Sequence, residues 1–336
     1  MFLFGLTDGA GRFDPLLLLA LALVLEAVSG GLFGSSGKKW GAASRFAPFV
    51  GTLERKLNRD RRSPTDRALR GTLLVLVFTA AAGTVGWGVA WLTQNHDFGW
   101  LVELVLLWAL LGQGRTYRRM KAVAATLTAG RAEAARAAIE PLVRHDPALM
   151  DVHGVPRAAI ESTAWTFSVD AVAPVFWYVL FGFPGFLAHR VLRVLDDTIG
   201  HLTPRYRAFG MAAARLDDIL NLIPARLSAL FIVLAAVFVP TAKPGRSWLV
   251  AWRGAGKHRS MNAGWPIAAM AGALDLALAG PRRRAGGVTD EAWIGEGTAQ
   301  ATGRDLGRAL YLYAVACLIN VAWLMALVVL GLSAGV

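Results

Sequence analysis

Cysteine is nearly absent from this chain. Its 336 residues include a single cysteine, Cys317, which lies inside a long apolar run. A lone thiol can supply neither an intramolecular disulfide framework nor the clustered thiolates of a structural zinc site. The sequence therefore argues against redox chemistry at paired cysteines and against a thiol-bound metal.

Several common catalytic and nucleotide-binding motifs are also missing. The chain contains no G-x-x-x-x-G-K-[ST], no G-x-S-x-G and no H-E-x-x-H. These are the signatures of a phosphate-binding P-loop, a serine nucleophile elbow and a zinc metalloprotease. Any nucleotide must then be bound in another way. The groups that remain for chemistry are Lys and Arg, which suit phosphates and carboxylates, and the carboxylates themselves, which suit a metal.

Charged residues are sparse. They make up 17% of the chain, whereas hydrophobic residues make up 55%. Basic residues outnumber acidic ones by 35 to 23, but they fall between apolar runs instead of forming one stripe with interleaved aromatic residues, which argues against nucleic acid as a partner. Long apolar runs joined by basic loops are typical of a multi-pass membrane protein. The positive-inside rule places the basic segments 38–70, 189–215 and 243–259 in the cytoplasm.

We therefore predict an all-α, polytopic integral membrane protein, a single membrane domain over 1–336, in the bacterial inner membrane with its active face toward the cytoplasm. About five to seven membrane segments are expected, some of them broken or re-entrant because Pro174 and Pro184 interrupt one run. The polar, Ala-rich segment 115–165 is predicted to be a cytoplasmic helical insertion. The candidate membrane segments are 15–34, 71–92, 98–113, 171–188, 219–240 and 309–332.

The first apolar run carries an acidic side chain, Glu26. No basic segment precedes this run, which favours an uncleaved anchor over a signal peptide. A carboxylate within a membrane segment is a functional candidate by default, although near a helix end it can also extend to water. The sequence leaves both interpretations of Glu26 open.

Asp217, Asp218 and Asn221 form the most suggestive polar cluster. Spacings of three and four residues place Asn221 on the same helical face as both carboxylates. Carboxylate and amide oxygens are hard ligands that suit Mg²⁺ holding phosphate oxygens. The alternative is a solvated helix start that favours acidic residues. Upstream, Glu161 lies four residues after Arg157, a spacing that also fits a plain surface ion pair.

The stretch from Lys257 to Pro281 changes character abruptly. Its head contains cations and small polar residues, including Lys257, Ser260 and Asn262, and it continues through Trp265 and Pro266 into an Ala/Gly-rich apolar helix. Such a junction naturally lies at a membrane surface, and Pro suits the first turn of a helix. A basic loop followed by an amphipathic or re-entrant helix would explain the pattern without any catalytic role.

This stretch resembles a known signature. Residues 260–274 fit S-x-N-A-G-W-P-x-A-A-M-A-G-A-L, the C-terminal motif of the adenosylcobinamide-phosphate synthases of cobalamin biosynthesis, the CobD/CbiB family. VPRAAIES, VAPVFWYVLFGFPG, RYRAFG, AARLDDILNLIPARL and RDLGRALYL also resemble family segments, in the family's order. The resemblance covers roughly residues 50–320.

The resemblance implies an amide-forming synthase. Such enzymes join a propionate of adenosylcobyric acid to the amino group of aminopropanol phosphate or a similar amino-alcohol phosphate, with ATP and Mg²⁺ assumed for activation. Corrinoid, amino-alcohol phosphate and membrane lipid are then the expected partners, and a homo-oligomer is compatible with this scheme. The expected catalytic residues are Glu161, Asp217 and Asp218, with Asp217 and Asp218 also holding Mg²⁺, and the expected substrate-binding residues are Arg215, Asn221, Arg226, Lys257, Ser260, Asn262 and Trp265.

The chain also departs from the family pattern. The family's G-D-P and H-P-V steps after the first span are missing. Trp165, Thr166 and Val169 stand where Glu, Asn and Asp are expected, and Arg193, Asp197 and His201 replace residues of N-T-L-D-S-M-x-G-Y. Two other functions therefore remain open: a diverged, non-catalytic paralogue acting as a partner or scaffold, and a signalling membrane protein related by fold, as AmpE-like proteins are.

The enzyme interpretation makes a geometric prediction. The acidic cluster at Asp217 should face the 257–265 stretch across a cytoplasm-facing site, because phosphate chemistry needs oxygen ligands and cations close together. Glu161 should line a third side. Arg215 or Arg226 should hold a phosphate or the corrinoid's carboxylate, since a guanidinium offers a fork of donors.

Overall fold

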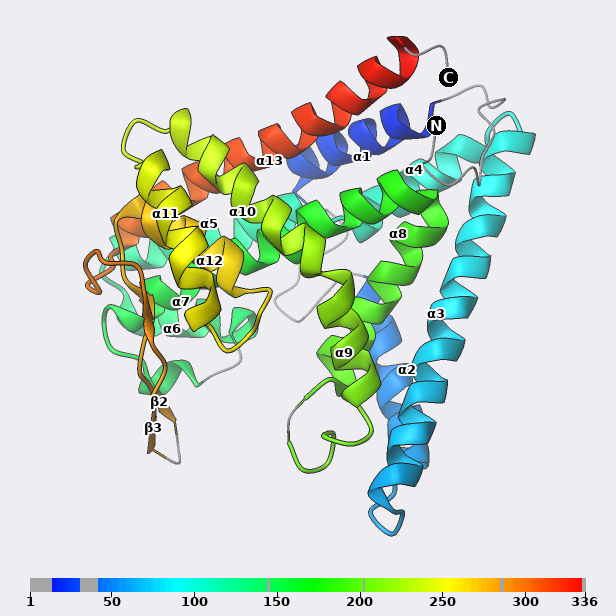
Figure 1. Ribbon diagram of the computed structural model, residues 1–336, viewed down its shortest axis with the longest axis horizontal. Helices are drawn as coiled ribbons and strands as arrows, with labels where there is room; N and C mark the ends of the chain where they lie inside the picture. Colours follow the sequence, from blue (N-terminus) through cyan, green and yellow to red (C-terminus); the bar gives the residue numbers. More distant parts are fainter. Residues whose placement is uncertain (1–13, 31–41, 144–145, 202, 285–286, 334–336) are drawn as a thin grey trace.

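The structure, a computed structural model, describes residues 14–30, 42–143, 146–201, 203–284 and 287–333. It is almost entirely helical (Figure 1). The α-helices are α1 (Pro15–Ser29), α2 (Ala42–Leu57), α3 (Pro64–Asn95), α4 (Gly99–Leu110), α5 (Gln113–Thr128), α6 (Ala132–Ile139), α7 (Gly154–Thr166), α8 (Ala173–Ile199), α9 (Met211–Leu220), α10 (Leu222–Val237), α11 (Pro244–Gly254), α12 (Gly264–Leu274) and α13 (Gly303–Ser333). The short elements are η2 (Glu140–Leu142), η3 (Pro147–Leu149), the π-helical η4 (Phe167–Val172), η5 (Ala255–Lys257), β1 (Leu278–Ala279), β2 (Arg282–Arg284), β3 (Gly287–Thr289) and β4 (Trp293–Ile294).

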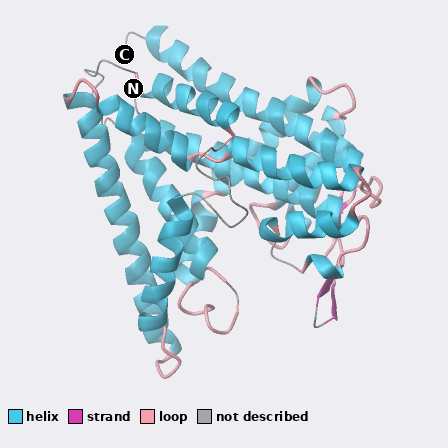
Figure 2. Ribbon diagram, turned by 180° about the vertical axis from the view of Figure 1, so that it is seen from behind, coloured by secondary structure: helices cyan, strands magenta, loops and turns pink. Residues whose placement is uncertain are grey.

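The helices form two groups that meet along one edge of the molecule (Figures 1 and 2). α2, α3, α9 and the second half of α8 make one arm, in which α3 packs on both α8 and α9. The other group contains α5, α6, α7 and α10 to α12, with the β2–β3 hairpin projecting from it. α1 lies beside α13 and α4 along the shared edge.

The lengths of the helices establish the fold class. Among the described residues, three helical stretches are long and apolar enough to cross a membrane: Pro64–Asn95, Gly154–Ile199 and Gly303–Leu330. A bent pair, α9 and α10, passes the same test jointly across a 45° break. The protein is therefore an all-α, polytopic membrane protein, as the sequence predicts. α1 and α12 are apolar but shorter, and the predicted segment 98–113 corresponds to the short helix α4.

A sharp kink divides α8. Gly182 has φ of +65° and ψ of −158°, a backbone conformation that glycine adopts without strain, and Pro184 follows within the same helix. The kink turns the second half of α8 along α3 (Figure 1). Close approach there requires a second glycine, because a Cβ on Gly86 of α3 would lie 2.6 Å from the Pro184 Cα.

Glu26 has a structural partner deep in the protein. Its side chain is buried, and its carboxylate accepts hydrogen bonds from the backbone N–H groups of Gly114, at 2.7 Å, and Arg115, at 3.2 Å. These donors belong to the first turn of α5, where N–H groups lack partners within the helix. Glu26 therefore caps α5 from α1 and does not extend to water.

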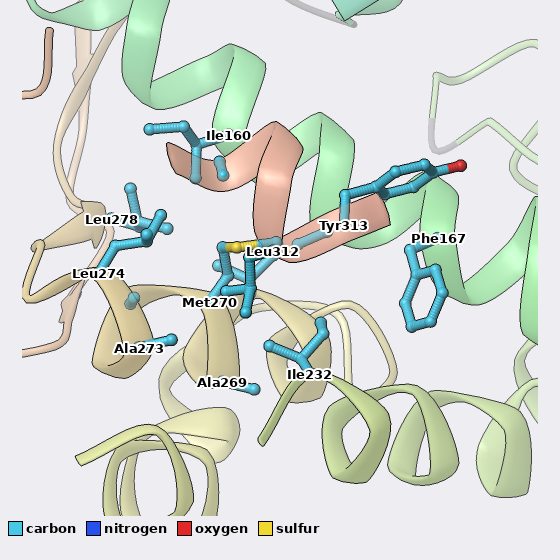
Figure 3. Packing of buried hydrophobic residues seen from close by; sticks show 14 of the residues in the cluster. Ile160, Phe167, Ile232, Ala269, Met270, Ala273, Leu274, Leu278, Leu312 and Tyr313 are labelled. Carbon is cyan, nitrogen blue, oxygen red and sulfur yellow. The ribbon is translucent and has the colours of Figure 1, made fainter. Parts of the chain in front are cut away.

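The largest apolar core lies around α12, whose residues from Pro266 to Leu274 are all buried. Figure 3 shows Met270 and Leu274 of α12 against Ile160 of α7, Ile232 of α10 and Leu312 of α13. α11 runs antiparallel along another face of α12, joined to it by a 2.8 Å hydrogen bond from the Ser247 hydroxyl to the Ala269 carbonyl. The apolar helix predicted after Trp265 is thus a buried element that fixes the position of the 257–265 stretch.

Candidate functional site

The site is built around the break between α9 and α10, at Asn221. A helix that stops there leaves the carbonyl groups of its last turn without partners in the helix. Side-chain donors reach three carbonyl groups of this turn: Asn221 Nδ2 donates to Asp217 O at 2.8 Å, Asn262 Nδ2 to Asp218 O at 2.7 Å, and Trp177 Nε1 to Leu220 O at 3.2 Å. Asp217 O also accepts a 3.0 Å hydrogen bond from Asn221 N. Residues from three parts of the chain therefore converge on the end of α9.

The Asn262 hydrogen bond joins the two stretches that the sequence singles out. Asp218 and Asn262 are 44 residues apart in the chain and in direct contact in the structure. The neighbouring Ser260 helps to begin α12, because its hydroxyl accepts a 3.3 Å hydrogen bond from Ala263 N. The acidic end of α9 and the polar head of the 257–265 stretch thus form one surface.

Arg193 of α8 is the central cation of the site, and the list of candidates from the sequence omits it. Its guanidinium contacts Asp217 at 2.8 Å, Asp196 at 3.1 Å and Asp197 at 2.7 Å. It also lies over the ring of Trp165 at 5.7 Å. Asp196 and Asp197 follow Arg193 by three and four residues, a helical spacing from which these two ion pairs could have been predicted. Asp217 is 24 residues away in the chain, so no helical spacing predicts its contact with Arg193.

A π-helical turn lies beside this network. In η4, the chain winds with i to i+5 hydrogen bonding, which takes up one residue more per turn than an α-helix, and such turns are frequent at functional sites. Asp170 of η4 forms a 2.8 Å ion pair with Arg190 of α8. The family pattern A-E-N-x-S-D-G corresponds to A-W-T-F-S-V-D-A here, with one extra residue. The π turn thus places Asp170 beside α8, close enough to Arg193 for the two charges to interact.

Glu161 of α7 binds the segment that follows α12. One carboxylate oxygen accepts a 2.8 Å hydrogen bond from Ala279 N, and the other pairs with Arg282 at 2.5 Å. Arg282 also contacts Glu291 at 3.3 Å. Both oxygens of Glu161 are therefore engaged, which makes this residue an anchor for the β1–β2 segment in the structure as it stands.

His258 belongs to the 257–265 stretch and lies near the Glu161 carboxylate. Its Nδ1 accepts a 3.0 Å hydrogen bond from Ser260 N. Burial lowers the pKa of the imidazole below its usual value, and this effect outweighs the opposing contributions of the Ser260 backbone and the nearby Glu161 carboxylate. The neutral imidazole is thus the form that the fold favours.

The remaining predicted cations lie at the outer side of the site. Arg226 is exposed and stacks over the Trp265 ring at 5.0 Å, and Trp265 in turn meets Trp252 edge to face at 6.2 Å. Arg215 and Lys257 are also exposed. These side chains are placed to meet a charged group arriving from solvent, whereas Asp217, Asn221 and Asn262 are buried.

The positions of the carboxylates limit how the expected Mg²⁺ could be held. Among the described residues, no group of three or more His, Cys, Asp and Glu side chains is placed to hold a metal ion. One oxygen of Asp217 is already bound to Arg193, whereas Asp218 is only half-buried. Mg²⁺ that arrives with a nucleotide keeps several waters and needs only one or two carboxylates. Asp218 fits that smaller requirement, so a nucleotide-bound Mg²⁺ is compatible with the site.

Comparison with known proteins decides the family. A family model described as CobD/Cbib protein matches residues 19–313. The chain belongs to the CobD/CbiB family. A "Cobalamin biosynthesis protein CobD" from a Sinorhizobium species is 39% identical over 319 residues, covering 93% of this chain and 98% of that protein. A protein of the same name from Rhizobium meliloti is 38% identical over 311 residues, covering 90% and 94%, and one from Rhodobacter capsulatus is 41% identical over 269 residues, covering 80% and 83%.

The family resemblance inferred from the 260–274 signature is thereby confirmed, and a role in cobalamin biosynthesis is supported with it. No solved structure matches the chain with significance. The assignment therefore rests on the family model and on relatives that align over most of their own length.

Proposed function

We propose that this protein forms the amide bond between a propionate side chain of adenosylcobyric acid and the amino group of aminopropanol phosphate, or a similar amino-alcohol phosphate, giving adenosylcobinamide phosphate. The observation that carries the proposal is the 2.7 Å hydrogen bond from Asn262 to the Asp218 carbonyl. It holds the family signature against the acidic end of α9, so that carboxylates, amides and cations share one site.

Amide formation needs a carboxylate oxygen turned into a leaving group and an amine held nearby as a free base. ATP with Mg²⁺ would supply the first by phosphoryl or nucleotidyl transfer, and Asp218 is the carboxylate placed to meet that ion. Arg215, Arg226 and Lys257 are exposed cations suited to the substrates' phosphate and carboxylate groups. Holding both substrates together accounts for much of the rate enhancement expected of such a site.

The departures from the family pattern favour a second candidate, a non-catalytic paralogue that acts as a membrane scaffold. The contacts within the site weigh against it. Trp165, Arg193 and Asp197 are all departures, and Arg193 contacts both of the others. Connected replacements beside Asp217 are the pattern expected of a rearranged site. We therefore prefer an enzyme whose site has been rearranged.

We also propose that the site faces the cytoplasm of the bacterial inner membrane.

Complementation tests the proposed function. A strain that lacks its adenosylcobinamide-phosphate synthase, supplied with cobyric acid, should grow under cobalamin-dependent conditions when it expresses the wild-type chain. Asp218→Ala should prevent growth while the protein still accumulates in the membrane fraction. Equal growth with both proteins would show that the reaction does not need the Asp218 carboxylate. Failure of the wild-type chain, with normal membrane insertion, would favour the scaffold.

A further inference from the structure

Three buried side-chain oxygens at the end of α9 lack a hydrogen-bond partner within the described part of the chain. They are Asp217 Oδ1, Asn221 Oδ1 and Asn262 Oδ1. We propose that these oxygens bind the ammonium group of the amino-alcohol phosphate, an inference that rests on the proposed function and assigns the amine end of that substrate. Buried polar atoms are nearly always paired in folded proteins. Two of these acceptors belong to the last turn of α9 and the third to Asn262, which contacts that turn. Their lack of partners therefore indicates a ligand that supplies donors.

The direction of each amide is fixed by its nitrogen. Asn221 Nδ2 donates to the Asp217 carbonyl and Asn262 Nδ2 to the Asp218 carbonyl. Only a donor can face a carbonyl, so exchanging the nitrogen and oxygen of either side chain would put two acceptors in contact. Each amide oxygen must therefore point away from the α9 carbonyls, and each remains available as an acceptor.

Arg193 determines how Asp217 presents its charge. The guanidinium binds Oδ2 of Asp217 at 2.8 Å and leaves Oδ1 unpaired. The site thus offers one carboxylate oxygen and two amide oxygens as acceptors, and the buried His189 ring, which lies against the Asn221 side chain, can donate to one of them. An anion would meet mainly acceptors, and a hydroxyl group would supply a single donor. A primary ammonium supplies three donors and the positive charge.

The same geometry positions the amine for reaction. The ammonium, R–NH₃⁺, loses one proton to water, and the electron pair of the neutral amine forms the C–N bond to the activated acyl carbon, whose leaving group departs with the electron pair of the bond that breaks. A second proton passes to water as the amide forms. Asp217, Asn221 and Asn262 thus hold the reacting nitrogen in place.

Binding of two related ligands to the full-length protein in detergent tests the inference without turnover. The probes are aminopropanol phosphate and propanediol phosphate, in which a hydroxyl replaces the ammonium. Wild-type protein should bind the amine at least about tenfold more tightly than the alcohol. Asn262→Ala and Asp217→Asn should lose most of that preference. Asp217→Asn keeps the shape of the side chain and serves as the second variant if Asn262→Ala fails to fold.

Asn320 of α13 provides a matched control. Its amide is also buried, its Nδ2 donates to Ala171 O at 3.4 Å, and its Oδ1 likewise has no partner within the described residues. Asn320→Ala should therefore keep the wild-type preference. Equal affinity of the wild type for both probes, or equal effects of Asn262→Ala and Asn320→Ala, would overturn the inference and indicate ordered water at these oxygens. If the wild type prefers the amine but forms no amide, the proposed function fails and the amine site stands.

Discussion

The guanidinium of Arg193 lies 5.7 Å from the centre of the Trp165 ring. Both residues stand where the family pattern has other residue types, and Asp197, a third departure, pairs with the same guanidinium at 2.7 Å. Substitutions that contact each other can compensate for each other. These three departures therefore form one connected cluster beside Asp217.

Removal of Arg193 should destabilise the protein strongly. Arg193→Ala leaves the buried carboxylates of Asp196 and Asp217 without their cation, a change that typically costs about 3–5 kcal/mol. Arg70→Ala is the control, because Arg70 pairs with Asp66 at the surface, where an ion pair contributes about 0–1 kcal/mol. Thermal unfolding in one detergent compares the two variants. Similar midpoints would mean that the Arg193 network does not support the fold.

The contact between α3 and α8 should not tolerate a methyl group. In Gly86→Ala, the added Cβ would lie 2.6 Å from the Pro184 backbone, so one of the two helices must shift. We expect a clear loss of stability. Gly83→Ala and Gly88→Ala lie on the same helix with nothing within 4 Å of the added Cβ, and they should be neutral or stabilising by about 0.5–1 kcal/mol. A Gly86→Ala protein as stable as these two would show that the helices are not in close contact.

Acidification should weaken the structure through His258. Burial lowers the pKa of this imidazole in the fold from its usual 6.5. The unfolded chain therefore binds the proton first as pH falls, and stability that is present above about pH 6.5 is lost progressively below it. Glu161, Arg282 and Glu291 are the neighbouring charged groups. The midpoint of thermal unfolding should fall more between about pH 7.5 and 5.5 for the wild type than for His258→Gln. Identical pH dependence would rule out this contribution.

The membrane orientation can be read from cysteine labelling, since Cys317 is the only native thiol to remove. In a Cys317→Ala background, Arg61→Cys and Lys121→Cys introduce exposed thiols in regions predicted to be cytoplasmic, and Asn95→Cys introduces one at the α3–α4 turn, predicted to lie outside. An impermeant reagent added to intact cells should label only Asn95→Cys. Labelling of the other two positions from outside would reverse the orientation.

The sequence indicates those features that leave a local signal. Apolar run length identifies α3 and α13, and the signature at 260–274 leads to the buried helix α12. The i, i+4 spacing of Asp217 and Asn221 corresponds to a direct contact at the end of α9. Each of these follows from residues that are near neighbours in the chain.

Contacts between residues far apart in the chain could not be predicted from the sequence in this way. Glu161 pairs with Arg282 across 121 positions, and Glu26 caps α5 across 88. Neither separation follows from helical periodicity, because these contacts are set by how the helices pack. The same reason explains why the sequence indicates Arg193 only as a departure from the family pattern and not as a partner of Asp217. Its place beside Asp217 depends on the kink that turns α8 toward α9.

Direct detection of the amide product tests the central claim most sharply. Membranes containing the wild-type chain, supplied with adenosylcobyric acid, aminopropanol phosphate, ATP and Mg²⁺, should yield adenosylcobinamide phosphate in mass spectra. Asp217→Asn removes the negative charge that holds the ammonium and should lower the yield by at least about a hundredfold, the size of loss expected from a misplaced reacting group, and Asn320→Ala should leave it unchanged. No product from correctly inserted wild-type protein would contradict the account, as would an Asp217→Asn variant that forms product at the wild-type rate.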